Sequence, residues 1–272
     1  MKPELYNPLG LRGEVKNLAA TACFVEIALH AGSWSAKVIE DTVRGGIILR
    51  EKVEPTGGIQ QLLSGRLPSN RTAEAIAARL PGCDIRRWRD HALWASLDRN
   101  VDVYSPIYDG AKRSLAMPLR QLVLKPLRLG SACAPSEPFS EEHVERVLVD
   151  TVTGDQQLPV FTAMTVLSNT NRYNREARCA TLLLFPRVVV RCPHLYIRWE
   201  ELLALFHRRV WRSKDNQEPF LYSVDEVRTR LLAEVVLVQQ EGFKIPPDSL
   251  LTSNRRRAKP QKTLRMDTIN AP

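Results

Sequence analysis

The stretch "IQQLLSGRLPSNRTAEAIAARLPGC", residues 59–83, shows the helical character on which the predicted fold is built. Apolar residues in its second half recur at spacings of three and four, which places them on one side of a helix. Gly65 and Pro68 interrupt the pattern, because glycine ends helices in a left-handed conformation and proline fixes a turn. The stretch therefore predicts two helices joined by a short turn. The apolar side of the second helix consists of Ala73, Ile76, Ala77 and Leu80.

Helical patterns recur along most of the chain. Ser140 precedes two acidic residues and predicts the start of one helix. Ser223 and Glu226 have the spacing of a capping box, and Gly242 ends the apolar pattern that follows them. These signals predict a mainly α-helical protein. Further helices are expected over residues 13–30, 34–49, 71–80, 84–97, 113–124 and 200–211.

Two segments of the second half have a different character. Residues 160–167 and 180–198 contain short apolar runs rich in valine and threonine, which favour strands. They leave open a small β-sheet, so that the second half would have an α+β fold.

The chain length and one linker-like segment predict two domains. A chain of 272 residues with 44% hydrophobic residues is long for one compact domain. The segment "GSACAPSEP" at 130–138 is rich in proline and small residues, as linkers are. We expect a helical domain over residues 1–130, a second domain over 140–250 and a flexible basic tail over 251–272.

The positive charge of the chain is concentrated in that tail. The formal net charge is +9, and residues 251–272 contribute +5 of it. Clusters of basic residues attract polyanions by long-range, salt-sensitive electrostatics, so the tail predicts contact with nucleic acid. Four of its residues form the run that we expect to make this contact, namely Arg255, Arg256, Arg257 and Lys259.

Other classes of function have little support in the sequence. The five cysteines are scattered and odd in number, which favours reduced thiols, and no run of about 18 apolar residues or signal pattern occurs. We therefore expect a cytoplasmic protein with no membrane partner, metal or cofactor. Cys192 and His194 are spaced for a nucleophile or metal site, but no carboxylate lies near them in sequence and Pro193 separates them. Catalytic motifs are absent as well, so we expect no enzyme activity.

Residues 59–80 resemble the back half of a phage-repressor-type (Xre-like) helix-turn-helix. Such domains often have an isoleucine, a glycine and a proline before a helix with Ile-Ala-x-x-Leu. The resemblance implies that the first helix of the stretch is a recognition helix and that the second packs behind it. The matching positions are Ile59, Leu62, Gly65, Pro68, Ile76, Ala77 and Leu80.

This resemblance implies a nucleic-acid interface, with DNA favoured. The outward positions of the recognition helix would meet bases and phosphates, since glutamine can pair with adenine in the major groove. Asn70 and Arg71 would hold a phosphate at the start of the next helix. The implied function is a regulator or an accessory subunit of a bacterial mobile-element or defence system. The alternative is a structural or adaptor protein that binds a protein partner or a second copy of itself. The implied contact positions on the first helix are Thr56, Gln60, Gln61, Ser64 and Arg66.

Overall fold

The computed structural model describes residues 9–44, 58–98, 102, 104–124, 139–170, 174–211 and 223–242. All regular elements in these ranges are helical, which confirms the mainly α-helical prediction. The α-helices are α1 (Gly13–Ala31), α2 (Ala36–Arg44), α3 (Gly58–Leu63), α4 (Asn70–Ala77), α5 (Ile85–Arg89), α6 (Ala92–Asp98), α7 (Pro106–Ser114), α8 (Met117–Val123), α9 (Glu141–Thr151), α10 (Gln157–Thr170), α11 (Arg175–Arg191), α12 (Pro193–Tyr196), α13 (Trp199–Phe206) and α14 (Val224–Gln240). A 3₁₀ turn, η1 (Gly154–Gln156), precedes α10, and a π-helical turn, η2 (His207–Trp211), follows α13.

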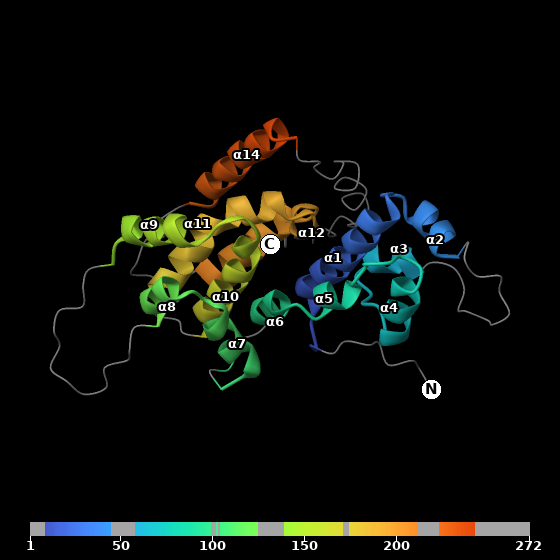
Figure 1. Cartoon of the computed structure of the whole chain (residues 1–272), viewed down its shortest axis with the longest axis horizontal. Helices are drawn as coiled ribbons and strands as arrows, with labels where there is room; N and C mark the ends of the chain where they lie inside the picture. The colour runs from blue at the N-terminus through green and yellow to red at the C-terminus, as the bar shows by residue number, and fades with distance from the viewer. Residues whose placement is uncertain are drawn as a thin grey trace, which may run out of the picture.

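The helices form two groups that meet at α12 (Figure 1). One group surrounds α1, which contacts α2, α3, α5, α6 and α12. The other surrounds α10 and α11, which pack against each other and against α7, α9 and α14. Helix α6 touches both α1 and α10. The boundary that we expected at 130–138 lies outside the described residues, so the division into domains stays a prediction.

The small β-sheet expected in the second half is wrong, since residues 160–167 lie in α10 and most of residues 180–198 lie in α11 and α12. These helices are buried on nearly every side, as the consecutive buried residues Val188, Val189 and Val190 show. A helix buried all round carries no polar face, so its sequence lacks the helical period that would identify it. Tertiary packing outweighs the modest β-preference of valine and threonine. No helix in the described ranges is long and apolar enough to cross a membrane.

Helix α1 is the scaffold of its group because most of its circumference is in contact with other helices. It is rich in alanine, whose small side chain lets neighbouring helices approach closely. Ala19, Ala20, Ala22 and Cys23 are all fully buried, as is Phe24. The helix ends at Gly32, which adopts a left-handed conformation with φ 65°.

The turn after α3 is the feature that the glycine at position 65 predicts. Gly65 has φ +88°, and its N–H and that of Arg66 donate to the carbonyls of Leu62 and Gln61 at 3.0 Å. This pair of bonds is a Schellman motif. A Cβ atom at Gly65 would lie 1.9 Å from Asn17 Oδ1 on α1, so any other residue would displace the Asn17 side chain as well as strain the turn.

Helix α4 follows the predicted stripe with one correction. Ala73, Ile76 and Leu80 are buried, whereas Ala77 is exposed. The helix ends at Ala77, so the residue lies on its final turn and turns away from the core. Ser69 caps the start of α4 by accepting the N–H of Thr72 at 3.1 Å.

The predicted helix caps in the second half are confirmed. Ser140 accepts the N–H of His143 at the start of α9. Ser223 and Glu226 form a reciprocal capping box at the start of α14. Caps of this kind satisfy backbone N–H groups that have no partner within the helix, so they are readable from a few neighbouring residues.

Four aromatic rings form the centre of the group around α10 and α11. Phe161 of α10 stacks on Phe206 of α13 with ring centroids 5.2 Å apart, and Phe185 of α11 meets Phe206 edge-on at the same distance. Trp211 contacts Phe185 and Phe206 and donates its indole N–H to Thr181 Oγ1. Phe206 therefore contacts all the other rings of this aromatic cluster.

We expect Phe206→Ala to lower the free energy of unfolding by about 3–5 kcal/mol, because it removes a fully buried ring and leaves a cavity. Urea unfolding followed by circular dichroism measures the change. The matched control is Leu232→Ala on α14, whose side chain is 52% exposed. The control is expected to change stability by about 1 kcal/mol or less. A loss of similar size in both variants would contradict the assignment of Phe206 to the core.

Candidate functional site

The predicted contact residues on α3 and in the turn after it divide into two pairs. Gln60 and Ser64 are exposed, four positions apart on the outer side of the helix end. Gln61 and Arg66 are half-buried and bond to each other, since Arg66 Nη1 donates to Gln61 Oε1 at 2.5 Å. Gln61 and Arg66 thus hold the turn after α3, and their polar groups are less available to a ligand. Thr56 lies outside the described residues.

Asn70 and Arg71 are exposed at the start of α4, as the phosphate-binding prediction requires. The Ser69 hydroxyl already accepts the N–H of Thr72, so fewer backbone donors remain free for a phosphate than in an uncapped helix. The tail residues Arg255, Arg256, Arg257 and Lys259 lie outside the described part of the chain.

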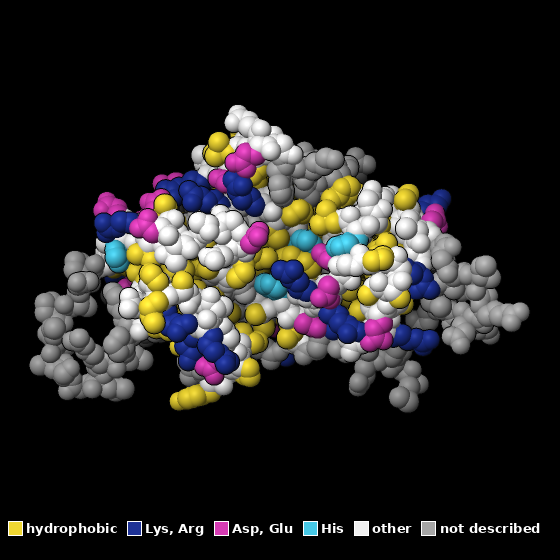
Figure 2. All heavy atoms as spheres, in the orientation of Figure 1, with side chains coloured by type: hydrophobic (Ala, Val, Ile, Leu, Met, Phe, Trp, Pro, Cys, Tyr) yellow, Lys and Arg dark blue, Asp and Glu magenta, His cyan; other side chains and the backbone are white. Residues whose placement is uncertain are grey.

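The surface around α4 carries charges of both signs. Figure 2 shows basic and acidic side chains interleaved over this end of the molecule. Arg86 pairs with Glu74 at 2.5 Å, and both side chains are largely exposed. Arg79 donates to the carbonyl of Ala75. The basic character of this surface is therefore modest, and α3 and α4 alone do not form a strongly positive patch.

A second polar cluster, which the sequence did not reveal, lies where α1, the turn before α5 and α12 meet. Figure 2 shows histidine side chains gathered there beside acidic and basic groups. Its central residue is Glu26 of α1, which is 12% exposed. His194 of α12 lies with Nε2 2.7 Å from Glu26 Oε2, and the N–H of Asp84 donates to Glu26 Oε1 at 3.2 Å. His30, one helical turn after Glu26, places Nδ1 3.6 Å from the same Oε1.

The protonation states in this cluster follow from these contacts. Burial raises the pKa of the Glu26 carboxyl. The hydrogen bonds from His194 and Asp84, together with the nearby histidines, lower this pKa by more than burial raises it, so the net shift is downward. Burial lowers the pKa of His194 more than its bond to Glu26 raises it. At neutral pH we therefore assign an ionised Glu26 that accepts the Nε2–H of a neutral His194.

Trp88 of α5 lies between two histidine rings. His194 stacks on it at 4.0 Å between centroids and His91 at 5.3 Å, with the rings within 17° of parallel. Burial, with a smaller contribution from the positive charge of Arg87, lowers the pKa of His91 to about 4. His91 is consequently neutral in the folded protein, and its Nδ1 accepts the N–H of Leu93 at 3.3 Å.

The pair Cys192 and His194 gains a carboxylate that sequence proximity did not provide. Cys192 Sγ lies 3.9 Å from His194 Nδ1, and Glu26 on the other side of the ring is 168 positions away in the chain. This order of thiol, imidazole and carboxylate resembles that of a cysteine nucleophile. Burial raises the pKa of Cys192 to about 12, however, so the thiol is protonated and weakly nucleophilic. The geometry therefore favours a structural role for Cys192.

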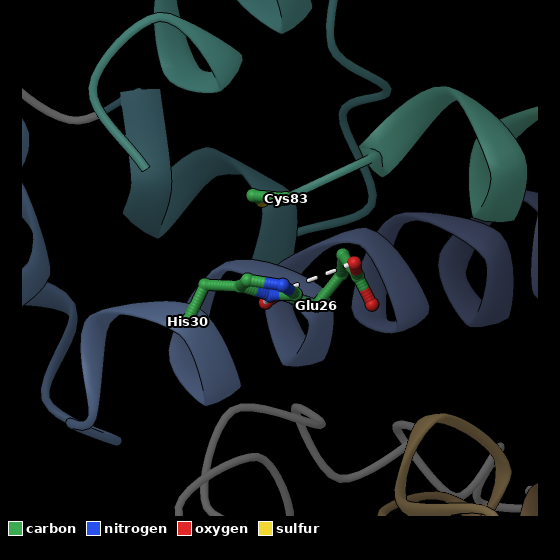
Figure 3. A group of neighbouring side chains, drawn as sticks. All are labelled: Glu26, His30 and Cys83. Carbon is green, nitrogen blue, oxygen red and sulfur yellow. Dashed lines mark hydrogen bonds and ion pairs between the residues drawn. The ribbon is translucent and has the colours of Figure 1, made fainter. Parts of the chain in front are cut away.

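Cys83 completes a different group with Glu26 and His30. One potential ligand atom from each of these three residues lies within 4.8 Å of the other two. Figure 3 shows Glu26 and His30 side by side on α1, with Cys83 facing them from the segment before α5. Burial, followed by the charges of Glu26 and Asp84, raises the pKa of Cys83 to about 12. A thiol, an imidazole and a carboxylate are therefore brought together from positions 57 residues apart.

One local signal for this cluster was present in the sequence. Glu26 and His30 are four residues apart in a predicted helix, a spacing that puts two side chains on the same face. Nothing local to Cys83 or His194 indicates that either lies beside them. The cluster cannot be read from the sequence because its members come from three distant segments.

Comparisons with models of protein families, with curated proteins and with solved structures give no match to this chain.

We expect acid to destabilise the protein through His91. The unfolded chain binds a proton at His91 near pH 6.5, whereas the folded protein binds it only near pH 4. Stability is therefore fully present above pH 6.5 and falls as the pH falls toward 4. This residue alone should lower the free energy of unfolding by about 1 kcal/mol between pH 6.5 and 5.5.

The variant His91→Asn tests this expectation, because the Asn oxygen can still accept the N–H of Leu93 but does not titrate. Urea unfolding at several pH values should show a shallower pH dependence than in the wild type. His143→Asn, which removes an exposed histidine of α9, is the matched control. Equal pH dependence in wild type and His91→Asn would show that folding does not lower the pKa of His91.

We expect the described cysteines to react slowly with thiol reagents while the protein is folded. Burial raises the pKa of Cys23, Cys83, Cys179 and Cys192. In a Cys133→Ser background, Ellman's reagent at about pH 8 should label these thiols only when urea unfolds the chain. Fast labelling of Cys192 in the native protein would show that this thiol is nucleophilic. It would contradict the structural role of Cys192 and favour a catalytic one.

Proposed function

We infer that the protein is a nucleic-acid-binding protein without enzyme activity, and that duplex DNA is its favoured partner. The observation that supports this inference is the exposure of Gln60 on α3 and of Ser64 just after it, together with that of Asn70 and Arg71 at the start of α4. Amide and hydroxyl groups can contact base edges, and an arginine next to a helix start suits a phosphate.

The proposed DNA contacts are fewer than the resemblance implies. Because Gln61 and Arg66 bond to each other, they are proposed to support the turn, and Gln60 and Ser64 are proposed to reach the DNA. Helix α3 has six residues, so few of its side chains can reach base edges at once. We therefore expect low sequence specificity, with most of the affinity coming from phosphate contacts.

The basic tail is proposed to supply most of those phosphate contacts. Its +5 charge exceeds the +4 carried by all the residues before it. Each basic residue that neutralises a phosphate releases counterions, so affinity falls steeply with salt. The resemblance of residues 59–80 to phage-repressor-type domains is the ground for proposing a regulator or an accessory subunit of a bacterial mobile-element or defence system.

We expect the full chain to bind a mixed-sequence DNA duplex with a strongly salt-dependent affinity. Fluorescence anisotropy at about 50 mM and 200 mM salt should show an affinity drop of about 100-fold or more, as for five phosphate contacts. Replacing Arg255, Arg256 and Arg257 by Gln should reduce the slope of log affinity against log salt by about three. Arg71→Ala should reduce it by about one.

Two matched controls separate these effects from general loss of charge. Arg228→Ala on α14 removes an exposed arginine, and Gln240→Ala removes an exposed glutamine. Gln60→Ala should change the preference among duplexes of different sequence, whereas Gln240→Ala should not. The proposal fails if the full chain shows no binding at about 50 mM salt, or if Arg228→Ala reduces the slope as much as Arg71→Ala.

The alternative function is that of an adaptor for a protein partner, and one observation favours it. Helix α14 packs on α11, where Arg191 pairs with Glu234 and Glu241. On α14, Leu232, Val236 and Leu237 are each half exposed. Exposed apolar side chains on one helix are common at protein–protein contacts. Failure of the DNA-binding experiment would leave this alternative as the better explanation.

A further inference from the structure

We propose that Glu26, His30 and Cys83 form a binding site for a divalent transition-metal ion, with Zn²⁺ as the best-matched ion. This inference does not depend on nucleic-acid binding. It rests on three residues of different ligand type whose ligand atoms lie within 4.8 Å of one another. A carboxylate oxygen, an imidazole nitrogen and a thiolate sulfur are the three kinds of ligand that zinc sites use. The sulfur argues against Mg²⁺ and Ca²⁺, which prefer oxygen ligands.

The two ligands on α1 have the spacing and rigidity that a metal site requires. Glu26 and His30 are one helical turn apart, so they project from the same face of the helix. Helix α1 is buried along most of its length and anchored on several sides, which fixes the backbone of both residues. In Figure 3 the third ligand, Cys83, faces this pair from the segment that leads into α5.

The orientation of the His30 ring leaves one nitrogen available. Its Nδ1 lies 2.9 Å from the carbonyl oxygen of Glu26, and since a carbonyl only accepts, this nitrogen carries the proton. The lone pair is then on Nε2. A Cβ atom built on Gly82 would lie 3.5 Å from that Nε2, so the free nitrogen faces the turn that carries Cys83. Metal-binding histidines commonly donate their other N–H to a backbone carbonyl in this way.

The Glu26 carboxylate is oriented by groups that do not themselves belong to the ligand set. His194 holds Oε2 at 2.7 Å, and the N–H of Asp84 holds Oε1 at 3.2 Å. Oε1 also lies toward His30, at 3.6 Å from Nδ1. Outer groups of this kind fix ligand geometry and contribute to metal affinity. His194 is therefore a positioning residue for the site.

The spacing of the ligands requires only a small contraction around the ion. With metal–ligand bonds of about 2.0–2.3 Å, ligands of a tetrahedral zinc site lie roughly 3.3–3.8 Å apart. The 4.8 Å limit, which holds for one nitrogen of the His30 ring, exceeds this by about 1 Å, and rotation of the side chains can bring Nε2 toward the other two ligands. A bound divalent ion would balance one carboxylate and one thiolate in a partly buried place, between the buried Cys83 and the exposed His30. Three protein ligands leave the fourth position for water or an outside ligand.

The experiment uses the purified full chain after treatment with a chelator, titrated with Co²⁺ as a spectroscopic substitute for Zn²⁺. A site with one thiolate gives a sulfur-to-cobalt charge-transfer absorption and the intense visible bands of a tetrahedral ion. We expect one Co²⁺ per chain, displaced by Zn²⁺. X-ray absorption of the Zn²⁺-loaded wild type should show one sulfur at about 2.3 Å together with nitrogen and oxygen ligands.

The variants identify the ligands. Cys83→Ser should abolish the charge-transfer band. Glu26→Gln and His30→Asn should each weaken Co²⁺ binding more than about 100-fold. Each removes a metal ligand, whereas a change at His194 removes only a group that orients a ligand. In His30→Asn the side-chain amide can still donate to the Glu26 carbonyl, so the helix is preserved while the metal-facing nitrogen is lost. Cys179→Ser and His143→Asn are matched controls and should bind Co²⁺ as the wild type does.

Two further variants separate the positioning role of His194 from a role in folding. His194→Ala should weaken Co²⁺ binding about 10–100-fold, and His194→Gln should restore it because the Gln amide can donate to Glu26. No charge-transfer band in the folded wild type would overturn the proposal. A band that persists in Cys83→Ser but disappears in Cys192→Ser would overturn this ligand set, and so would two sulfurs in the X-ray absorption spectrum.

Discussion

The hydrogen bond between Glu26 and His194 joins the two groups of helices at the point where α1 meets α12. Both side chains are nearly buried, at 12% and 10% exposure, and they join α1 to α12. An ionised carboxylate in such a place needs its donors, because an unsatisfied buried charge is costly. The bond to Glu26 also sets the plane of the imidazole that stacks on Trp88. The contact between Glu26 and His194 is thus part of the packing between the helix groups and also part of the polar cluster.

Features specified by neighbouring residues were predictable from the sequence. Ser223 and Glu226 cap α14, and Ser140 caps α9, because a cap needs only a side-chain oxygen two or three positions from a free N–H. Gly65 was predictable for the same reason, since a left-handed residue at a helix end is a local requirement. Local signals of this kind also predict the helical class of the protein and the exposure of Gln60 and Ser64.

Features that depend on burial or on distant residues were not predictable in this way. The valine-rich end of α11 resembles a strand because a helix surrounded by other helices has no polar side to show its period. Ala77 fits an apolar stripe, and only the end of α4 at that residue explains its exposure. Cys192 and His194 appeared to lack a carboxylate because Glu26 reaches them through the packing of α1 against α12. Sequence distance is a poor guide to such a site.

The close approach of Gly65 to Asn17 places the turn after α3 directly against α1, the helix that also carries Glu26 and His30. Backbone at Gly65 lies so close to Asn17 that the turn after α3 cannot move toward α1 without displacing that side chain. Asn17 and Glu26 lie on one uninterrupted helix, nine residues or about 14 Å apart along its axis. One helix therefore supports both the α3–α4 turn, near its start, and the carboxylate of Glu26, toward its end.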